Sequence, residues 1–228
     1  MTRLLISVSS VAEACLALAA GADIVDGKDA AAGPLAALPD VTLRDIVAAV
    51  AGRVPVSATI GDWPAEPEVL LQAAERVAAA GVDWVKVGFY PGGDWDACRA
   101  ALAPLAQRTP LIALLLADRT PNPTEQLAAF AAAGFRGVML DTASKDGRRL
   151  TDHSSVGSLS GFVAEARKHH LQCGLAGSLR QTDLADLLPL GADVLGFRGA
   201  ACLDGRRAQA LCADRVTALA DALQVSVF

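Results

Sequence analysis

The 228-residue chain is poor in lysine, with four lysines against sixteen arginines. Arginine stays protonated in proteins, whereas a partly desolvated lysine beside other cations can lose its proton and attack a carbonyl. A lysine that stands in an apolar segment of this chain is therefore expected to be kept for its amine. Three lysines do so: Lys28 ends Gly-Ala-Asp-Ile-Val-Asp-Gly-Lys, Lys86 lies within Val-Asp-Trp-Val-Lys-Val-Gly-Phe-Tyr, and Lys145 follows Gly-Val-Met-Leu-Asp-Thr-Ala-Ser.

Other absences narrow the function further. The net charge is −5, and no basic run or alternation of aromatic and basic residues suggests a nucleic-acid surface, although a local basic pocket for phosphate fits the composition. Neither a GxGxxG fingerprint nor a metal-ligand cluster is present, so we expect no cofactor and no metal. Without a Pro- or Ser-rich linker, residues 1–228 are predicted to form a single domain.

The cysteines and the N-terminus bear on the compartment. The five cysteines lie far apart without a CxxC or Cys/His spacing, which is typical of small buried residues in a reducing environment. The apolar start followed by Ala-Leu-Ala-Ala-Gly imitates a signal peptide. However, Glu13 interrupts it, and the same Ala-Ala-Gly-x-Asp ending recurs at 79–83. We therefore predict a first strand and helix, a cytoplasmic protein and no membrane segment.

Apolar runs alternate with Ala- and Leu-rich stretches along the whole chain. The predicted strands are Arg3–Val8, Ile24–Asp26, Val56–Ile60, Trp84–Phe89, Leu111–Leu116, Gly137–Asp141, Cys173–Ala176 and Val194–Phe197. Among the predicted helices are Val11–Ala20, Glu66–Ala80, Thr124–Ala133 and Arg206–Leu223. Several of the helical stretches end in a glycine that can supply a left-handed cap: Gly21, Gly81, Gly134 and Gly191.

Eight such strand–helix units predict a TIM (β/α)8 barrel, in which the loops after the strands gather at one face and form the site. An open, doubly wound sheet is the structural alternative. The number of units and the missing GxGxxG favour the closed barrel.

In a barrel, five ionisable residues are expected at one mouth. Lys86 faces the interior, because alternate residues of its strand do so. Asp26 and Lys28 stand at the end of the second strand, and Asp141 and Lys145 at the end of the sixth.

This grouping suits Schiff-base chemistry, which needs a lysine that is neutral at the working pH. A second ammonium lowers the pKa of the first by repulsion, and nearby aspartates can hold the spare cations and carry protons. A set of salt bridges that merely closes the barrel mouth is the alternative interpretation.

Two glycine-containing turns follow strands seven and eight, where many TIM barrels bind phosphate. The candidate phosphate ligands are Gly177, Ser178, Arg198 and Gly199. Asp62 and Asp118 follow strands three and five and are equally compatible with loop caps and with the site, so they stay outside the catalytic set.

Six separated segments then carry a family resemblance. Gly-Ala-Asp-Ile-Val-Asp-Gly-Lys, Val-Ser-Ala-Thr-Ile-Gly-Asp-Trp-Pro, Asp-Trp-Val-Lys-Val-Gly-Phe-Tyr, Met-Leu-Asp-Thr-Ala-Ser-Lys-Asp-Gly, Gly-Leu-Ala-Gly-Ser and Gly-Phe-Arg-Gly-Ala-Ala-Cys occur in this order. Together they resemble the (5-formylfuran-3-yl)methyl phosphate synthase family, which makes the furan of methanofuran and methylofuran. The resemblance implies that two glyceraldehyde 3-phosphate molecules condense, with loss of phosphate and water.

The resemblance also assigns roles. It implies that Lys28 forms the Schiff base, that Lys86 is the proton acceptor, and that Asp26, Asp141 and Lys145 support them. The family's Asp-Val-Lys-Asn-Pro reads Asp26-Gly27-Lys28-Asp29-Ala30 here, without the proline.

Two rival functions remain open from the sequence. Another lysine-dependent aldolase, of the deoxyribose-phosphate type, would place its nucleophile on strand six, at Lys145. Alternatively, a non-catalytic barrel could bind a phosphorylated metabolite, its lysines neutralising the ligand's charge. The oligomeric state is also open, a homo-oligomer included.

Overall fold

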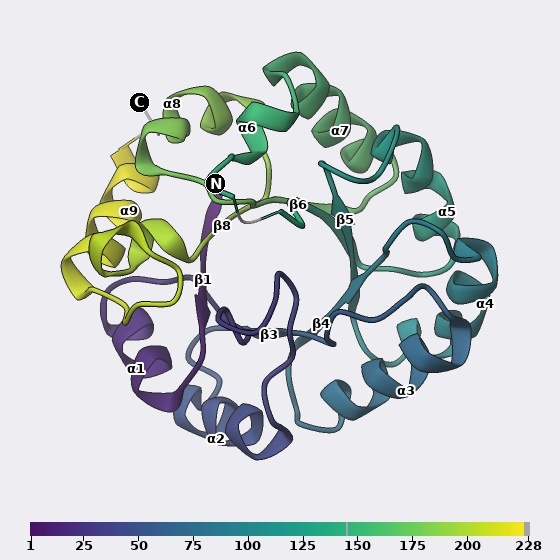
Figure 1. The fold of residues 1–228 in the computed structure, drawn as a ribbon, viewed down its shortest axis with the longest axis horizontal. Helices are drawn as coiled ribbons and strands as arrows, with labels where there is room; N and C mark the ends of the chain where they lie inside the picture. Colours follow the sequence, from purple (N-terminus) through teal and green to yellow (C-terminus); the bar gives the residue numbers. More distant parts are fainter. Residues whose placement is uncertain (145, 226–228) are drawn as a thin grey trace.

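The computed structural model describes residues 1–144 and 146–225, so the predicted catalytic Lys145 lies outside the described residues. Eight parallel strands pair in sequence order and close into a barrel, β1 pairing with β8 (Figure 1). They are β1 (Arg3–Val8), β2 (Ile24–Gly27), β3 (Val56–Thr59), β4 (Trp84–Gly88), β5 (Leu111–Leu116), β6 (Gly137–Asp141), β7 (Gln172–Leu175) and β8 (Val194–Phe197). The predicted TIM barrel is confirmed.

The helices form a ring around the strands (Figure 1). They are α1 (Val11–Ala19), α2 (Asp40–Val50), α3 (Pro67–Ala78), α4 (Trp95–Ala106), α5 (Leu127–Ala132), α6 (Leu150–His153), α7 (Val156–Lys168), α8 (Leu184–Leu187) and α9 (Ala213–Val225). Short 3-10 turns are η1 (Pro123–Gln126), η2 (Gln181–Asp183), η3 (Leu188–Leu190), η4 (Gly199–Ala201) and η5 (Leu203–Gly205). Within the described ranges, no helix is both long and apolar enough to span a bilayer.

The predicted glycine turns are present, and the backbone conformation at each explains why glycine is there. Gly21, Gly81, Gly134 and Gly191 all have positive φ angles, of 97°, 84°, 84° and 70°. Glycine adopts this left-handed region without the steric penalty that a Cβ atom brings. Each turn lies between a helix and the next strand, and so delivers that strand to the barrel.

Alternation along the strands sorts side chains into two apolar layers. Val85 and Val87 belong to the layer between barrel and helices, and both are fully buried. Leu5, Ile24 and Met139 belong to a separate cluster inside the barrel. Burying an aliphatic side chain of this size stabilises the fold by about 1.5–3 kcal/mol. Because the layers alternate, Lys86, between the two valines, is directed into the interior, as predicted.

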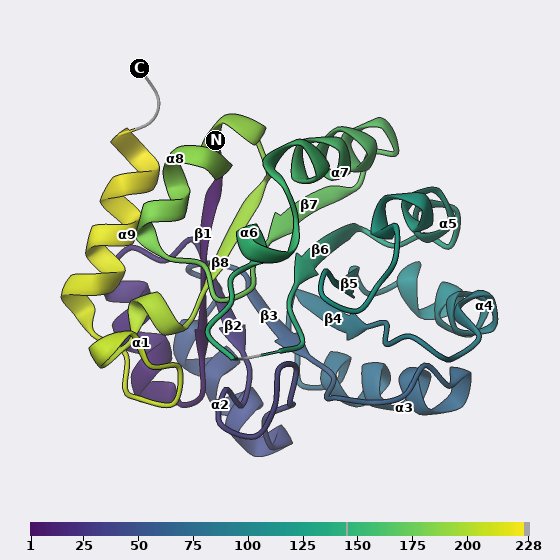
Figure 2. The same ribbon diagram turned by 45° about the horizontal axis from the view of Figure 1, so that its top comes forward.

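The segment between β2 and α2 covers part of the barrel mouth. It is drawn in dark purple and reaches over the centre of the ring (Figures 1 and 2). Leu35, which is 1% exposed, anchors it by packing with the interior cluster. The Leu35 N–H donates to Asp62 Oδ1 at 3.0 Å. Asp29, where the family pattern has asparagine, accepts the N–H groups of Ala31 and Ala32 at 3.0 and 3.2 Å.

One predicted helix begins later than expected. The helix predicted over Arg206–Leu223 starts at Ala213, and residues 206–212 instead run back antiparallel to the end of the β8 loop. Leu203 N–H donates to Ala210 O at 3.0 Å, and Cys212 N–H donates to Ala201 O at 2.9 Å. Leu211 is 6% exposed and packs in the core, so tertiary burial outweighs the local helix propensity. We call residues 206–212 the return segment.

Candidate active site

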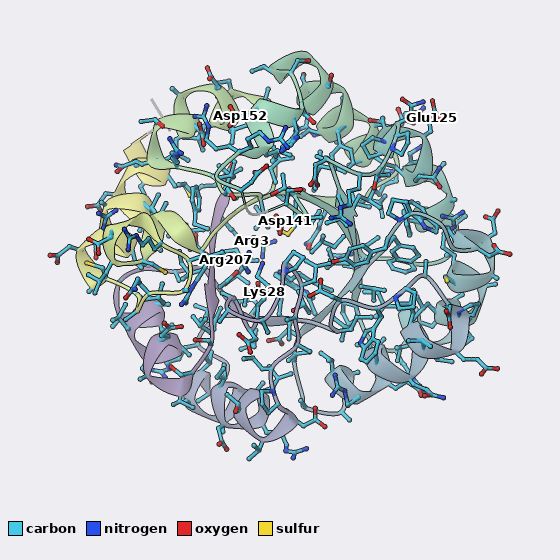
Figure 3. The ribbon with its side chains drawn as sticks, viewed as in Figure 1. Arg3, Lys28, Glu125, Asp141, Asp152 and Arg207 are labelled. Atoms are coloured by element: carbon cyan, nitrogen blue, oxygen red, sulfur yellow. The ribbon has the colours of Figure 1, made fainter. Side chains whose placement is uncertain are left out.

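A cavity of about 830 Å³ opens at the carboxyl ends of the strands. Its lining includes residues from strands β4 and β6 and from several βα loops: Lys28, Lys86, Asp141, Gly177, Ser178, Arg198, Gly199 and Arg207. Figure 3 shows Lys28, Asp141 and Arg207 near the centre of the ring, whereas Glu125 and Asp152 lie at its edge. The predicted site residues among the described residues therefore come together at one mouth.

Lys86 and Asp26 form a tight, buried ion pair. Lys86 Nζ lies 2.6 Å from Asp26 Oδ1, and the two residues are 3% and 0% exposed. Asp26 also accepts hydrogen bonds from Ser57 Oγ at 2.6 Å and from Ser7 Oγ at 2.9 Å. The strand register explains this arrangement, because Ser7 and Ser57 are the direct neighbours of Asp26 on β1 and β3. Three donors therefore fix the carboxylate in place.

Burial and charge act in opposite directions on this pair. Burial raises the pKa of Asp26, but the charges of Lys86 and Lys28 and the hydrogen bonds outweigh it, so the pKa is lowered and the carboxylate stays ionised. For Lys86, burial lowers the pKa, the Asp26 charge opposes this, and repulsion by Lys28 lowers it further. The net result is a pKa below the ordinary lysine value. Lys86 is therefore easier to deprotonate than a surface lysine.

Lys28 has a looser arrangement at the end of β2. Its Nζ lies 3.7 Å from Asp141 Oδ2, beyond hydrogen-bond distance, and its side chain is 8% exposed. Its backbone N–H donates to Val8 O at 3.0 Å, which fixes the chain as it leaves the barrel. Asp141 ends β6 and accepts its neighbour Thr142 N–H at 2.7 Å. The Lys28 amine is thus held at the cavity by a distant counter-charge.

The turns after β7 and β8 present backbone donors to the same cavity. Gly177 and Ser178 have φ angles of 111° and 51°, and a Cβ at Gly177 would lie 2.9 Å from Thr142 Cγ2. Throughout residues 1–144 and 146–225, no acceptor is hydrogen-bonded to the N–H of Ser178 or Gly199. Free amides beside a cavity are suited to an anion such as phosphate.

Arg198 is the exception among the predicted phosphate ligands. Its guanidinium donates to both oxygens of Glu13, at 2.6 and 3.0 Å. It also donates to the backbone oxygens of Ser7, Arg207 and Gln209, at 3.1, 2.9 and 3.0 Å. A guanidinium has five N–H groups, and here all five have protein acceptors. Arg198 therefore ties the β8 turn to α1.

Asp62 and Asp118, left undecided by the sequence, both bond to loops. Asp62 accepts the Tyr90 hydroxyl as well as the Leu35 amide. Asp118 accepts the N–H groups of Ala143 and Ser144, at 2.7 and 2.8 Å. Burial raises the pKa of Asp118, but these backbone bonds outweigh it and the net pKa is lowered.

Sequence reasoning missed three residues near the site. Ser7 and Ser57, which bond to Asp26, could have been found from strand parity, since each stands at the interior position opposite that aspartate. Arg207 had no such signal, because its segment was predicted to be helical.

Comparison with solved structures supports the fold. Phosphoribosyl anthranilate isomerase from Thermus thermophilus superposes with a TM-score of 0.69, covering 98% of this chain and 99% of that protein at 18% identity. At this identity the likeness shows the barrel fold alone.

Sequence comparison shows the family. The sequence model of the 4-HFC-P synthase family matches residues 4–220. A Methylorubrum extorquens protein that provisionally bears the name (5-formylfuran-3-yl)methyl phosphate synthase is 43% identical over 97% of this chain and 92% of its own length. The Methanopyrus kandleri (5-formylfuran-3-yl)methyl phosphate synthase is 38% identical over 97% of this chain and 98% of its own length. Matches of this extent, together with a site that holds four of the expected catalytic residues, show that the chain is an enzyme of the (5-formylfuran-3-yl)methyl phosphate synthase family.

Proposed function

We propose that the protein condenses two molecules of glyceraldehyde 3-phosphate into (5-formylfuran-3-yl)methyl phosphate through a Schiff base on Lys28. The observation that carries this proposal is the contrast between two lysines at the barrel mouth. The Lys28 amine lies at the cavity with Asp141 Oδ2 3.7 Å away, whereas the Lys86 amine is held 2.6 Å from Asp26 Oδ1. Atoms balance when one phosphate and two waters leave. No redox change is needed.

The first step uses Lys28 as the nucleophile. Its amine attacks the aldehyde carbon of one triose phosphate, and water leaves to give the imine. The protonated imine withdraws electrons from the adjacent carbon, which makes the proton on that carbon acidic. Asp141, whose carboxylate lies 3.7 Å from the Lys28 amine, is placed to stabilise the iminium charge.

Lys86 is the proposed base for the next step. In its neutral form it removes the acidified proton, and the resulting enamine attacks the aldehyde of the second triose phosphate. Its lowered pKa makes the neutral form more accessible than in a surface lysine, and Asp26 stabilises the ammonium after proton transfer. The later eliminations of water and phosphate need acid and base groups, for which Asp141 and Lys145 are our candidates.

The substrate phosphate is proposed to bind at the turns after β7 and β8. The amides of Ser178 and Gly199 and the close backbone at Gly177 support an anion site there. Because the Arg198 N–H groups are engaged with Glu13 and carbonyls, we assign Arg198 to positioning this turn.

The test is incubation of the purified protein with glyceraldehyde 3-phosphate alone. We expect an ultraviolet-absorbing furan aldehyde and free phosphate in equal amounts, and a borohydride-trapped adduct on Lys28 by mass spectrometry. Lys168 is an internal control, because it is exposed on α7 and paired with Glu165 at 2.9 Å. Lys168→Arg should leave trapping and turnover unchanged.

Two outcomes would favour the rival functions. An adduct on Lys145 with none on Lys28 would indicate an aldolase of the deoxyribose-phosphate type. Substrate binding with neither adduct nor product would indicate a non-catalytic binding barrel.

A further inference from the structure

The return segment carries an arginine that the chemistry above does not use. Arg207 is partly buried and lines the cavity, and Figure 3 shows it close to Lys28 in projection. Its guanidinium donates to Gly33 O at 2.7 Å, in the segment between β2 and α2. Among the described residues this is the single hydrogen bond of the Arg207 side chain, and no carboxylate lies within ion-pair distance of it.

Arg207 differs sharply from Arg198, although both belong to the loop after β8. Arg198 has five protein acceptors for its five N–H groups, whereas Arg207 has one. The other four N–H groups of Arg207, which have no protein acceptor among the described residues, can therefore donate to a ligand that enters the cavity. Arginine's planar fork matches phosphate oxygens, to which it can donate two parallel bonds.

The guanidinium of Arg207 lies away from the turns after β7 and β8, although its backbone does not. Its backbone oxygen accepts from Arg198, so its chain lies beside the β8 turn, but its guanidinium reaches the loop after β2. The side chain therefore crosses the rim above β1, which stands between β8 and β2 in the barrel. The charged groups that act on it are Asp141, Arg198, Asp62 and Asp29. Burial lowers its pKa, which the aspartates oppose and Arg198 reinforces.

The proposed reaction brings two phosphate groups into one cavity, and these need two separate anion sites because they repel each other. The turns after β7 and β8 offer one site. We propose that Arg207 binds the phosphate of the second triose phosphate, the molecule that the Lys28 enamine attacks. This inference rests on the proposed function. It also assigns the return segment to substrate recognition, with the Gly33 contact holding the loop that follows Lys28.

The experiment distinguishes binding of the first substrate molecule from binding of the second. Borohydride trapping on Lys28 requires only the first, whereas furan formation requires both. In Arg207→Ala, the glyceraldehyde 3-phosphate concentration for half-maximal furan formation should rise by about tenfold to a hundredfold, as expected for lost bonds to a charged group. The concentration dependence of trapping should stay within about twofold of the unmodified enzyme. Arg207→Lys keeps the positive charge but loses the planar pair of donors. Its concentration for half-maximal furan formation should lie between those of the unmodified enzyme and Arg207→Ala.

The control is Arg44→Ala, which removes an equal charge from an exposed position on α2, outside the cavity lining. It should match the unmodified enzyme in both assays, and thermal unfolding should show that all variants are folded. The inference is overturned if Arg207→Ala forms furan with an unchanged concentration dependence. It is also overturned if trapping and furan formation weaken in parallel. Arg207 would then bind the phosphate of the first triose phosphate, or would only stabilise the segment between β2 and α2.

A binding measurement keeps this inference distinct from the proposed function. Calorimetric titration of the unmodified protein with inorganic phosphate should show two sites, and Arg207→Ala should lose one of them. If the unmodified enzyme gives no Lys28 adduct, the proposed function fails. Identical phosphate titrations for the two proteins would overturn the Arg207 site.

Discussion

The two lysine–aspartate pairs of the barrel mouth use the same residue types and differ in how tightly they are held. Lys86 lies 2.6 Å from Asp26, whose oxygens also accept two serine hydroxyls. Lys28 lies 3.7 Å from Asp141 and is slightly more exposed than Lys86, at 7% against 3%. The tight pair is suited to holding and releasing a proton at a fixed point. The loose pair leaves an amine able to turn toward a carbonyl carbon.

The difference follows from position along the strands. Asp26 and Lys86 lie within β2 and β4, where neighbouring strands place hydroxyls at fixed register. Lys28 is the first residue after β2, where the ladder has ended and the loop begins. The position of each residue along its strand thus distinguishes the proposed base from the proposed nucleophile, and four changes test that distinction.

The largest effect is expected for Lys28→Arg. The charge and approximate size are kept, but a guanidinium cannot form the imine, so turnover should fall by at least about 10⁴-fold. Product formation and borohydride trapping would both be measured. Substantial turnover in this variant would move the nucleophile elsewhere.

Lys86→Met should lower the rate of furan formation by about 10²–10⁴-fold, the range for losing a general base, while an adduct still forms on Lys28. Because the base must be neutral, the rate of the unmodified enzyme should rise with pH through the lowered pKa of Lys86. The variant should lack that rise. If it keeps the same pH dependence, another group is the base.

Asp26→Asn tests the tight pair through stability. It leaves the Lys86 ammonium buried without its partner, so the free energy of unfolding at neutral pH should fall by about 3–5 kcal/mol. The pKa of Asp26 is lowered in the folded protein, so its contribution is complete above the ordinary aspartate pKa, about 3.9, and is lost as pH falls through the lowered value. Denaturant unfolding between pH 2 and 7 would measure this. A loss below about 1 kcal/mol would mean that the pair is weakly coupled.

The smallest effect is expected for Ser57→Ala, which removes one hydrogen bond from the Asp26 carboxylate. The unfolding free energy should fall by about 1.5–3 kcal/mol, and Lys28 trapping should persist. Ser160→Ala, at an exposed position on α7, is the control and should change stability by no more than about 0.5 kcal/mol. Equal effects for the two serines would show that the strand register adds nothing to the pair.

The sequence predicted the barrel well because its signals are local. The apolar runs of the strands and the glycines at the ends of the helices were placed within one or two residues of their observed positions. Strand parity then directed Lys86 inward, and the carboxyl-end rule brought Lys28 and Asp141 to one mouth, where Asp26 pairs with Lys86. These residues could be named in advance because each stands within or next to a regular strand.

Residues in long loops could not be placed in the same way. Arg198 had the sequence features of a phosphate ligand, but Glu13, distant in sequence, accepts two of its N–H groups in the folded chain. Residues 206–212 had the composition of a helix, and burial of Leu211 turned them back instead. Local propensity is worth a fraction of a kcal/mol per residue, less than the burial of one leucine.

By itself, then, the amino-acid order determined the eight-unit barrel, its family and the group of lysines and aspartates at its mouth, because periodicity and spacing carry that information. Only the tertiary structure decided which amine is tightly paired, which arginine is already satisfied, and that Arg207 reaches across the rim to the loop after Lys28. These depend on distances between segments far apart in sequence, which are fixed only when the barrel closes.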